Sequence, residues 1–187
     1  MSRDDWVVGG DRHATAAERI FAAATDLVSR EGLDALDIDT LAATVHCSRA
    51  TIYRYAGGKA QIRDAVTLRI AERIIGTVRR AVEGLSGPER VLVAIGVALE
   101  QIRTVPTRHL MLVSTVADLT GLHASSMLSQ IAAELAGIAT DDEQAAQWIV
   151  RVVISMSHWP PSNTAAEQDM LRRFVLPAFE AGLKQQG

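Results

Sequence analysis

The side chains between residues 44 and 63 are suited to binding rather than to covalent chemistry. This stretch has no aspartate or glutamate, and its cations are Arg49, Arg54, Lys59 and Arg63. Arginine and lysine bind phosphate oxygens, and short or planar polar side chains such as Thr51 and Tyr53 fit a DNA major groove about 12 Å wide. The chemistry that this segment offers is therefore hydrogen bonding and charge pairing with a nucleic acid.

The rest of the chain does not share this basic character. The 187 residues carry a formal net charge of −3, and residues 81–187 hold seven basic and eleven acidic side chains. Because clustered cations attract nucleic acid and a net negative charge does not, we expect any nucleic-acid contact to be confined to the basic segment.

Three short helices are predicted to position the basic segment. A capping box at Thr15–Glu18 opens the first helix, which Gly32 ends, and residues 1–13 are predicted to be a flexible tail. Asp37 is the expected N-cap of a second helix, and Ser48 that of a third from Arg49 to about Tyr55, with Ile52 facing inward. Two short helices separated by three residues predict a helix-turn-helix at about 38–55.

The remaining chain is predicted to be helical throughout. A connector helix runs from Lys59 to about Gly84, and helices follow over 88–106, 107–118, 122–138, 141–158 and 164–184. Capping boxes beginning at Thr140 and Thr164 open the last two, and Pro177 is expected to kink the final helix. With 48% hydrophobic and 4% aromatic residues and no credible strand, the fold class is all-α. The predicted domains are the tail 1–13, a helix-turn-helix domain 14–58, and a connector with an effector-binding and dimerisation bundle 59–187.

The motif resembles the N-terminal domain of tetracycline-repressor-type (TetR family) regulators. The matching segments are Glu18-Arg19-Ile20-Phe21-Ala22-Ala23-Ala24, Leu41-Ala42, Ser48-Arg49-Ala50-Thr51-Ile52-Tyr53-Arg54-Tyr55 and Lys59. The resemblance implies a homodimeric, all-helical transcription regulator, most simply a repressor released from a palindromic operator by a small effector. It also places Arg49 and Thr51 at base edges and Tyr53, Tyr55 and Lys59 at phosphates. The implied DNA-binding set is Ser48, Arg49, Thr51, Tyr53, Arg54, Tyr55 and Lys59.

Four residues depart from the family pattern. His46 stands where the turn usually has glycine, Cys47 replaces an apolar residue, Ala56 replaces a phenylalanine, and Asp37 replaces a neutral threonine near the expected phosphate path. Histidine adopts the left-handed conformation more readily than most residues. Cys47 has two interpretations, a thiol that acts as a redox switch at a helix N-terminus or a small buried hydrophobe.

An effector pocket is expected in the C-terminal bundle. The candidate lining residues lie on its predicted helices and are Leu99, Met111, Ser114, Met127, Trp148 and Met156. Scarce aromatic residues and few central charges favour an apolar or weakly polar effector. The histidines His109, His123 and His158 have no metal-ligand spacing, and hydrolase, dinucleotide and P-loop motifs are absent from the sequence, so neither an enzyme nor a cofactor is expected.

Partners and location follow from the same features. The helices near 141–158 and 164–184 have broad apolar surfaces with small residues, and the resemblance implies that they form the dimer interface. The sequence has no apolar run that predicts a membrane span and no signal-peptide pattern, which predicts a cytoplasmic protein. The alternative function is a helical small-molecule-binding or protein-interaction module with a degenerate helix-turn-helix.

Overall fold

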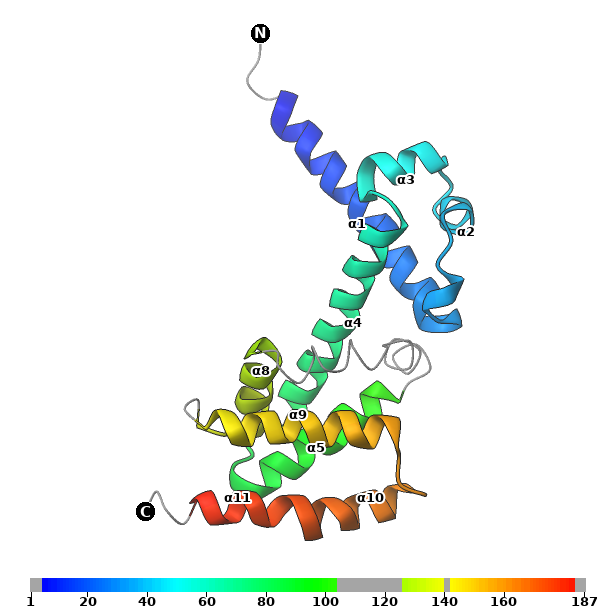
Figure 1. Ribbon diagram of the computed structural model, residues 1–187. Coiled ribbons are helices and arrows are strands. Elements are labelled where there is room, and N and C mark those ends of the chain that lie inside the picture. Colours follow the sequence, from blue (N-terminus) through cyan, green and yellow to red (C-terminus); the bar gives the residue numbers. More distant parts are fainter. Residues whose placement is uncertain (1–4, 104–125, 140–141, 184–187) are drawn as a thin grey trace. The chain divides into compact units, whose positions relative to one another are not determined.

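The computed structural model describes residues 5–103, 126–139 and 142–183, and these residues form helices and no strand (Figure 1). The predicted all-α class is confirmed. The described residues divide into two compact units, a first unit of residues 5–71 and a second unit that begins at Glu72. This division falls inside helix α4 (Lys59–Ala81), whereas the sequence suggested a boundary at residue 58. The difference arises because the first half of α4 buries Ile62 and Val66 in the first unit.

The first unit contains the three helices expected from the sequence, with one difference in length. They are α1 (Asp5–Glu31), α2 (Ile38–Thr44) and α3 (Arg49–Ala56), and a short turn, η1 (Leu33–Ala35), follows α1. Helix α1 begins ten residues before the expected start at Thr15, so most of the predicted tail is helical. No proline interrupts this stretch, so nothing in the sequence forces the helix to begin later. The N–H of Gly32 donates to the Val28 carbonyl at 2.9 Å, and α1 ends there as predicted.

Local hydrogen bonds define the turn between α2 and α3. Asp37 caps α2, and His46 has a φ of 55°, so the left-handed conformation expected of this residue is confirmed. The N–H of His46 donates to the Ala43 carbonyl at 3.2 Å and that of Cys47 to the Ala42 carbonyl at 2.9 Å. These two bonds form the Schellman arrangement that ends many helices, with histidine in the position usually held by glycine. The chain is thereby redirected into α3 within three residues.

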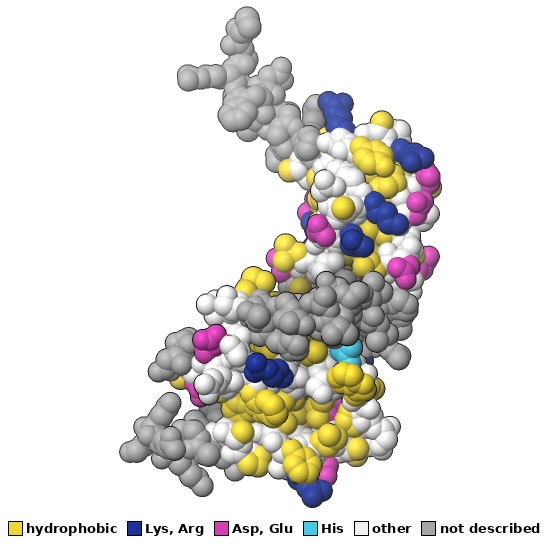
Figure 2. Space-filling view, in the orientation of Figure 1, with side chains coloured by type: hydrophobic (Ala, Val, Ile, Leu, Met, Phe, Trp, Pro, Cys, Tyr) yellow, Lys and Arg dark blue, Asp and Glu magenta, His cyan; other side chains and the backbone are white. Residues whose placement is uncertain are grey.

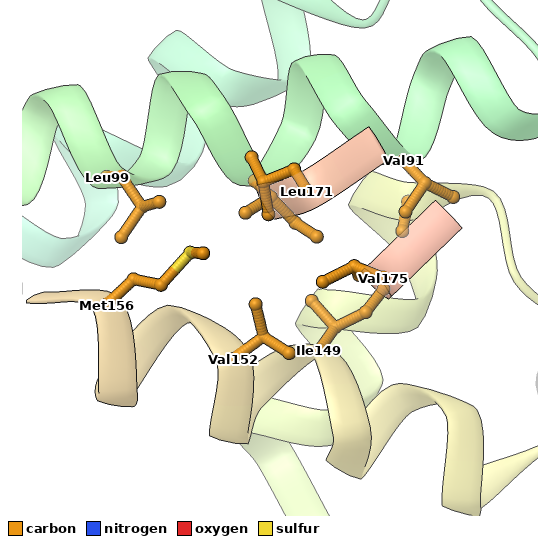
Figure 3. Close-up of a cluster of buried hydrophobic side chains, with 9 residues drawn as sticks. Val91, Leu99, Ile149, Val152, Met156, Leu171 and Val175 are labelled. Carbon is orange, nitrogen blue, oxygen red and sulfur yellow. The ribbon is translucent and has the colours of Figure 1, made fainter. Parts of the chain in front are cut away.

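The second unit packs α5 (Gly87–Ile102) against the C-terminal helices. These are α8 (Ser126–Ala136), α9 (Glu143–His158), α10 (Thr164–Met170), a π-helical turn η2 (Leu171–Val175) and α11 (Leu176–Leu183). Figure 3 shows the core that joins them, where Val91 and Leu99 of α5 meet Ile149, Val152 and Met156 of α9 and Leu171 and Val175 of η2. The helix predicted over 107–118 lies outside the described residues.

Arg90 fastens the C-terminus of α8 to this core. Its guanidinium donates to the carbonyls of Leu135 at 2.9 Å and Glu134 at 2.8 Å, which are two of the carbonyls that a helix end leaves unpaired. Gly137, at φ 70°, follows directly. A Cβ at this glycine would lie 2.7 Å from the Arg90 Cδ atom, so the close approach requires glycine.

The last two helix starts differ from the predicted capping boxes. Asp142 caps α9 by accepting the Ala145 N–H at 3.0 Å, and Thr140 lies outside the described residues. Asn163, not Thr164, caps α10 by accepting the Ala166 N–H at 2.9 Å. Asparagine and aspartate are stronger N-caps than threonine, and they shift each helix start accordingly.

A kink was expected at Pro177, and what the structure shows there is the π-helical turn η2 just before the proline. The N–H of Leu176 donates to the carbonyl of Leu171, five residues back, and α11 then continues across the proline. Proline donates no N–H and its ring crowds the carbonyl four residues earlier, so a widened turn at this point relieves the clash. Within the described helices, none is long and apolar enough to span a membrane.

Candidate nucleic-acid interface

Helix α3 buries one face and exposes a polar face. Ile52, the residue predicted to point inward, is fully buried, and Ala56 one turn later is nearly so. Arg49, Tyr53 and Arg54 are exposed, while Thr51 and Tyr55 are half-buried. A short helix with this division packs on its neighbour and presents hydrogen-bonding groups outward, as a groove-binding helix must. Figure 2 shows basic and acidic side chains interspersed on the face of the first unit seen there.

Ser48 and Thr51 form the start of α3. The Ser48 Oγ accepts the Thr51 N–H at 3.2 Å and lies 2.9 Å from the Thr51 hydroxyl oxygen. The predicted N-cap is therefore confirmed. Because Ser48 holds the first turn in place, it fixes the backbone from which the Arg49 side chain extends.

The aromatic and basic side chains at the end of α3 are arranged for contacts with an anion. The Arg54 guanidinium carbon lies 5.6 Å from the centre of the Tyr55 ring, within the range of a cation–π contact. Tyr53 is half exposed and stands free of the core. A tyrosine hydroxyl and a guanidinium on one helix end can both donate to phosphate oxygens.

Lys59 is the first residue of α4. The N–H of Gly58 donates to the Gln61 side-chain oxygen at 3.0 Å, which is the N3 half of a capping box, and Gly57 turns the chain at φ 78°. Lys59 is exposed at a helix N-terminus, where unpaired N–H groups and a mobile cation together favour a phosphate.

Two carboxylates lie beside these cations. The Asp37 carboxylate accepts the N–H groups of Asp39 at 3.0 Å and Thr40 at 3.1 Å. The Thr40 bond is the largest cause of the lowered pKa of Asp37, and the charge of Lys59 lowers the pKa further. Asp37 is therefore ionised within electrostatic range of Lys59.

The Asp39 carboxylate forms an ion pair that the sequence analysis missed. Its Oδ1 atom lies 3.3 Å from the Nε atom of Arg49, and the two side chains are 64% and 60% exposed. Asp39 and Arg49 are ten positions apart and on different helices. Their contact depends on how α2 and α3 cross, which no local spacing rule predicts.

Cys47 has an intermediate position. Its side chain is half-buried, and its sulfur lies 3.5 Å from the Ser48 carbonyl oxygen. The thiol is thus neither fully packed in the helix-turn-helix core nor fully exposed at the start of α3.

Comparisons with known proteins agree with this geometry. The family described as "Bacterial regulatory proteins, tetR family" matches residues 20–66, which include α2, α3 and the start of α4. The chain is 30% identical over 185 residues to the uncharacterized HTH-type transcriptional regulator Rv1255c of Mycobacterium tuberculosis (strain ATCC 25618 / H37Rv). That match covers 95% of this chain and 91% of the relative.

The chain belongs to the tetR family of bacterial regulatory proteins. As a member of this family it is a DNA-binding transcriptional regulator, and α2 and α3 are its helix-turn-helix. The family resemblance inferred from the sequence is confirmed.

Solved structures show the same fold. The TetR family repressor AlkX from Dietzia sp. strain DQ12-45-1b, implicated in biodegradation of n-alkanes, superposes with a TM-score of 0.56 at 20% identity, covering 87% of this chain and 97% of that one. The repressor QsdR of R. erythropolis superposes with a TM-score of 0.56 at 21% identity, covering 89% and 95%. At these identities the likeness establishes the shared TetR fold.

In the second unit of this TetR-family chain, the residues predicted to line an effector pocket do not lie together. Leu99 and Met156 are core residues that face each other in Figure 3. Met127 and Trp148 are exposed on α8 and α9. Met111 and Ser114 lie outside the described residues. The effector-binding set therefore stays a prediction.

A cavity of about 630 Å³ lies between α5 and α10. Its apolar lining comes from Leu92, Val93, Val97 and Leu171, and its polar lining includes Arg103 and Glu167. None of the four described effector candidates is among its lining residues. Its size falls within the usual range of ligand pockets.

Arg103 and Glu167 form a partly buried ion pair at this cavity. The Arg103 Nη2 atom donates to the Glu167 Oε2 atom. The Glu167 side chain is 6% exposed and that of Arg103 is 33% exposed. The Arg103 Nε atom is buried without a hydrogen-bond partner in the described part of the chain. The sequence assigned Glu167 to a capping box, but the structure turns this carboxylate inward.

Exposed apolar side chains gather on the C-terminal helices. Trp148 of α9, Met170 of α10 and Phe174 of η2 are each at least 40% exposed, as is Trp159 just after α9. Figure 2 shows hydrophobic side chains crowding the face of the second unit seen there. These helices include the two predicted to form the dimer interface.

His158 is only partly the hydrogen-bonded histidine expected, because its Nε2 atom is buried without a hydrogen-bond partner in the described part of the chain. Its Nδ1 atom lies 3.0 Å from the Ile154 carbonyl oxygen. His109 and His123 lie outside the described residues. Among the side chains that the structure describes, no group of three or more histidine, cysteine, aspartate or glutamate residues could hold a metal ion.

Proposed function

We propose that the protein is a homodimeric repressor that binds a palindromic operator and leaves it when a small apolar effector binds the second unit. The observation that carries the proposal is the polar outer face of α3, held by the Ser48 cap and followed directly by Lys59 at the start of α4. Base contacts need a rigid helix with exposed donors, and phosphate contacts need a cation at its edge. We expect it to act in the cytoplasm, where bacterial DNA lies.

The contacts divide by role. Arg49 and Thr51, in the first turn of α3, are placed for base edges, because the N-terminal residues of a recognition helix reach the groove floor. Tyr53, Arg54 and Tyr55, later in α3, and Lys59, at the start of α4, are proposed to contact phosphates. Ser48 acts mainly through its cap. In this arrangement Lys59 supplies affinity for any sequence, and Arg49 supplies preference for one base.

The dimer is proposed to form through α9, α10, η2 and α11. Exposed Trp148, Met170 and Phe174 on these helices give an apolar surface that a second copy of the chain can cover. A two-fold dimer places two recognition helices on one face of the duplex, with half-sites about 34–36 Å apart or a multiple of that distance.

The effector is proposed to be apolar or weakly polar and to bind within the second unit. The cavity between α5 and α10 is the candidate place for it: four of its twelve lining residues are aliphatic and can contact an apolar group, and seven are polar or charged and can bind a polar one. An effector shifts the DNA-binding equilibrium only by the difference in its affinity for the two conformations, and a coupling of about 1–3 kcal/mol changes operator affinity some 5- to 150-fold.

The test is selection of DNA from a random pool by the purified protein. We expect an inverted repeat, and sedimentation should show a dimer at micromolar concentration. Lys59→Ala should weaken binding to all sequences and lower the salt slope by about 1, whereas Arg49→Ala should relax preference at one base pair for about 1–3 kcal/mol. Selected DNA without any repeat, together with a stable monomer, would instead support the alternative of a ligand-binding or protein-interaction module.

A further inference from the structure

We propose that Asp39 is a positioning residue that orients Arg49 for reading a guanine, so that base preference at the Arg49 position depends on a carboxylate of α2. The proposal rests on the DNA-binding function proposed above and adds to it the residue that sets the direction of the Arg49 side chain. It is carried by the ion pair between the two helices of the helix-turn-helix.

Both ends of this pair extend from backbone that is already fixed. Asp39 lies in the first turn of α2, where its own N–H is held by the Asp37 carboxylate at 3.0 Å. Arg49 is the first residue of α3, whose first turn is held by the Ser48 cap at 3.2 Å. Two side chains anchored on capped helix starts meet in one geometry more often than two on mobile loops. The pair therefore restricts where the guanidinium points.

Asp39 contacts Nε, and the two terminal nitrogens of the guanidinium can bind a guanine without Nε. Its Oδ1 atom lies 3.3 Å from Nε of Arg49. A guanidinium reads guanine through two parallel N–H groups to O6 and N7, and the edge made by the two terminal nitrogens supplies them. Among the described residues, Asp39 is the one ion-pair partner of Arg49, and the Arg49 side chain is 60% exposed, so its terminal nitrogens are accessible to a base. The carboxylate of Asp39 lies on the Nε side of the guanidinium, which leaves the two terminal nitrogens for the base.

The pair stabilises the free protein little, because both side chains are more than half exposed and water screens them. Its effect appears in the complex. When DNA covers the pair, water leaves, and attraction between the two charges strengthens. A cation without a carboxylate partner could move to a nearby phosphate. Arg49, which is attracted to Asp39 at its Nε atom, is instead expected to stay at the base edge. The negative charge of Asp39 also repels phosphates, so the pair adds preference for a base at the expense of non-specific attraction.

The neighbouring Asp37 does not have this role. Both N–H contacts of its carboxylate are to the α2 backbone, and the cation that lowers its pKa is Lys59, not Arg49. The two acidic residues are therefore separated by function, with Asp37 shaping the helix start and Asp39 facing the recognition helix.

The experiment compares full-length Asp39→Ala, Asp39→Asn, Arg49→Ala and the Asp39→Ala/Arg49→Ala double variant. Asp34→Asn is the matched control. Asp34 is an exposed carboxylate of the same unit, so this substitution removes the same charge from the first unit as Asp39→Asn does. Selection with the wild type and with Arg49→Ala identifies the base pair that depends on Arg49. Affinity is then measured at one salt concentration for the selected operator and for the operator with that base pair replaced.

We expect Asp39→Ala to lower discrimination at that base pair at least about threefold and to leave the other positions of the operator unchanged. Asp39→Asn, which keeps an oxygen acceptor, should retain part of the discrimination. The double variant should discriminate between the two operators no less than Arg49→Ala alone does, because Asp39 acts through Arg49. Asp34→Asn should discriminate between them as the wild type does. Circular dichroism of each variant shows that the helices are retained.

Three results would overturn the inference. Asp39→Ala and Asp34→Asn could both tighten binding to every sequence with discrimination intact, which would make Asp39 a general repulsive charge. Discrimination could be lost at a different base pair, which would make Asp39 itself a base reader. Arg49→Ala could leave the selected sequence unchanged. If the wild type selects no DNA at all, the proposed function fails as well, and this outcome is distinct from the other three.

Discussion

Removing Arg103 should destabilise the second unit more than removing Glu167, although the two residues form one ion pair. The reason is the difference in burial, since the Glu167 side chain is 6% exposed and that of Arg103 is 33% exposed. Losing Arg103 leaves a buried carboxylate without its cation, and breaking a buried pair in this way costs about 3–5 kcal/mol. Losing the Glu167 charge leaves a guanidinium that can turn toward solvent, so we expect about 1–2 kcal/mol.

The assay is urea denaturation followed by tryptophan fluorescence, because Trp148 and Trp159 lie in the second unit. Arg103→Met keeps the aliphatic stem, and Glu167→Gln keeps the size of the side chain. The control is Arg173→Met, whose partner Asp169 is 61% exposed and whose loss should leave the midpoint nearly unchanged. The reasoning is refuted if Glu167→Gln costs as much as Arg103→Met at an unchanged m-value.

Three further predictions follow from the caps and turns. Ser48→Ala removes the cap of α3 and should cost about 1 kcal/mol in thermal unfolding, with weaker operator binding; no change in either would mean that α3 needs no cap. The pKa of Asp37 is lowered in the folded protein. The stabilisation from its ionised carboxylate is therefore fully present above the ordinary pKa of 3.8 and is lost as the pH falls through the folded-state pKa. Asp37→Asn keeps a cap oxygen, so acid titration of unfolding should show a smaller loss and operator affinity should rise; an unchanged acid profile argues against this assignment. Gly137→Ala should lower the melting temperature more than Gly84→Ala, because both glycines have positive φ but only the former would bring a Cβ to 2.7 Å from Arg90; equal effects would show that this contact is relieved without cost.

The helix-turn-helix could be predicted from the sequence because its determinants are local. Asp37 and Ser48 accept N–H groups two or three residues ahead, and the turn at His46 closes within five residues. Cap residues, turn conformations and apolar spacing act over such distances, so they can be read from a single chain. The same reasoning correctly predicted that Ile52 is buried.

The ion pairs could not be predicted in this way. Asp39 meets Arg49 across a helix crossing, and Arg103 meets Glu167 across 64 positions of chain. Neither helix crossing angles nor distant contacts are encoded by spacing along one helix. Glu167 illustrates this, because its place three residues after Thr164 satisfies the capping-box pattern, while in the structure its carboxylate pairs with the partly buried Arg103.

The distribution of charge on the first unit favours recognition by two half-sites over tight binding by one. Cations at Arg49 and Lys59 each have a carboxylate close by, at Asp39 and Asp37 respectively. Since affinity for any DNA grows with the number of phosphates that cations neutralise, this pairing lowers non-specific binding, and the ratio of specific to non-specific affinity is what selects an operator. In the proposed dimer, a weak half-site would depend on the second copy of the chain to reach a useful affinity. Occupancy of the operator would then fall steeply when the two recognition helices no longer match the half-site spacing, so the proposed effector would need only a modest coupling energy to release the protein.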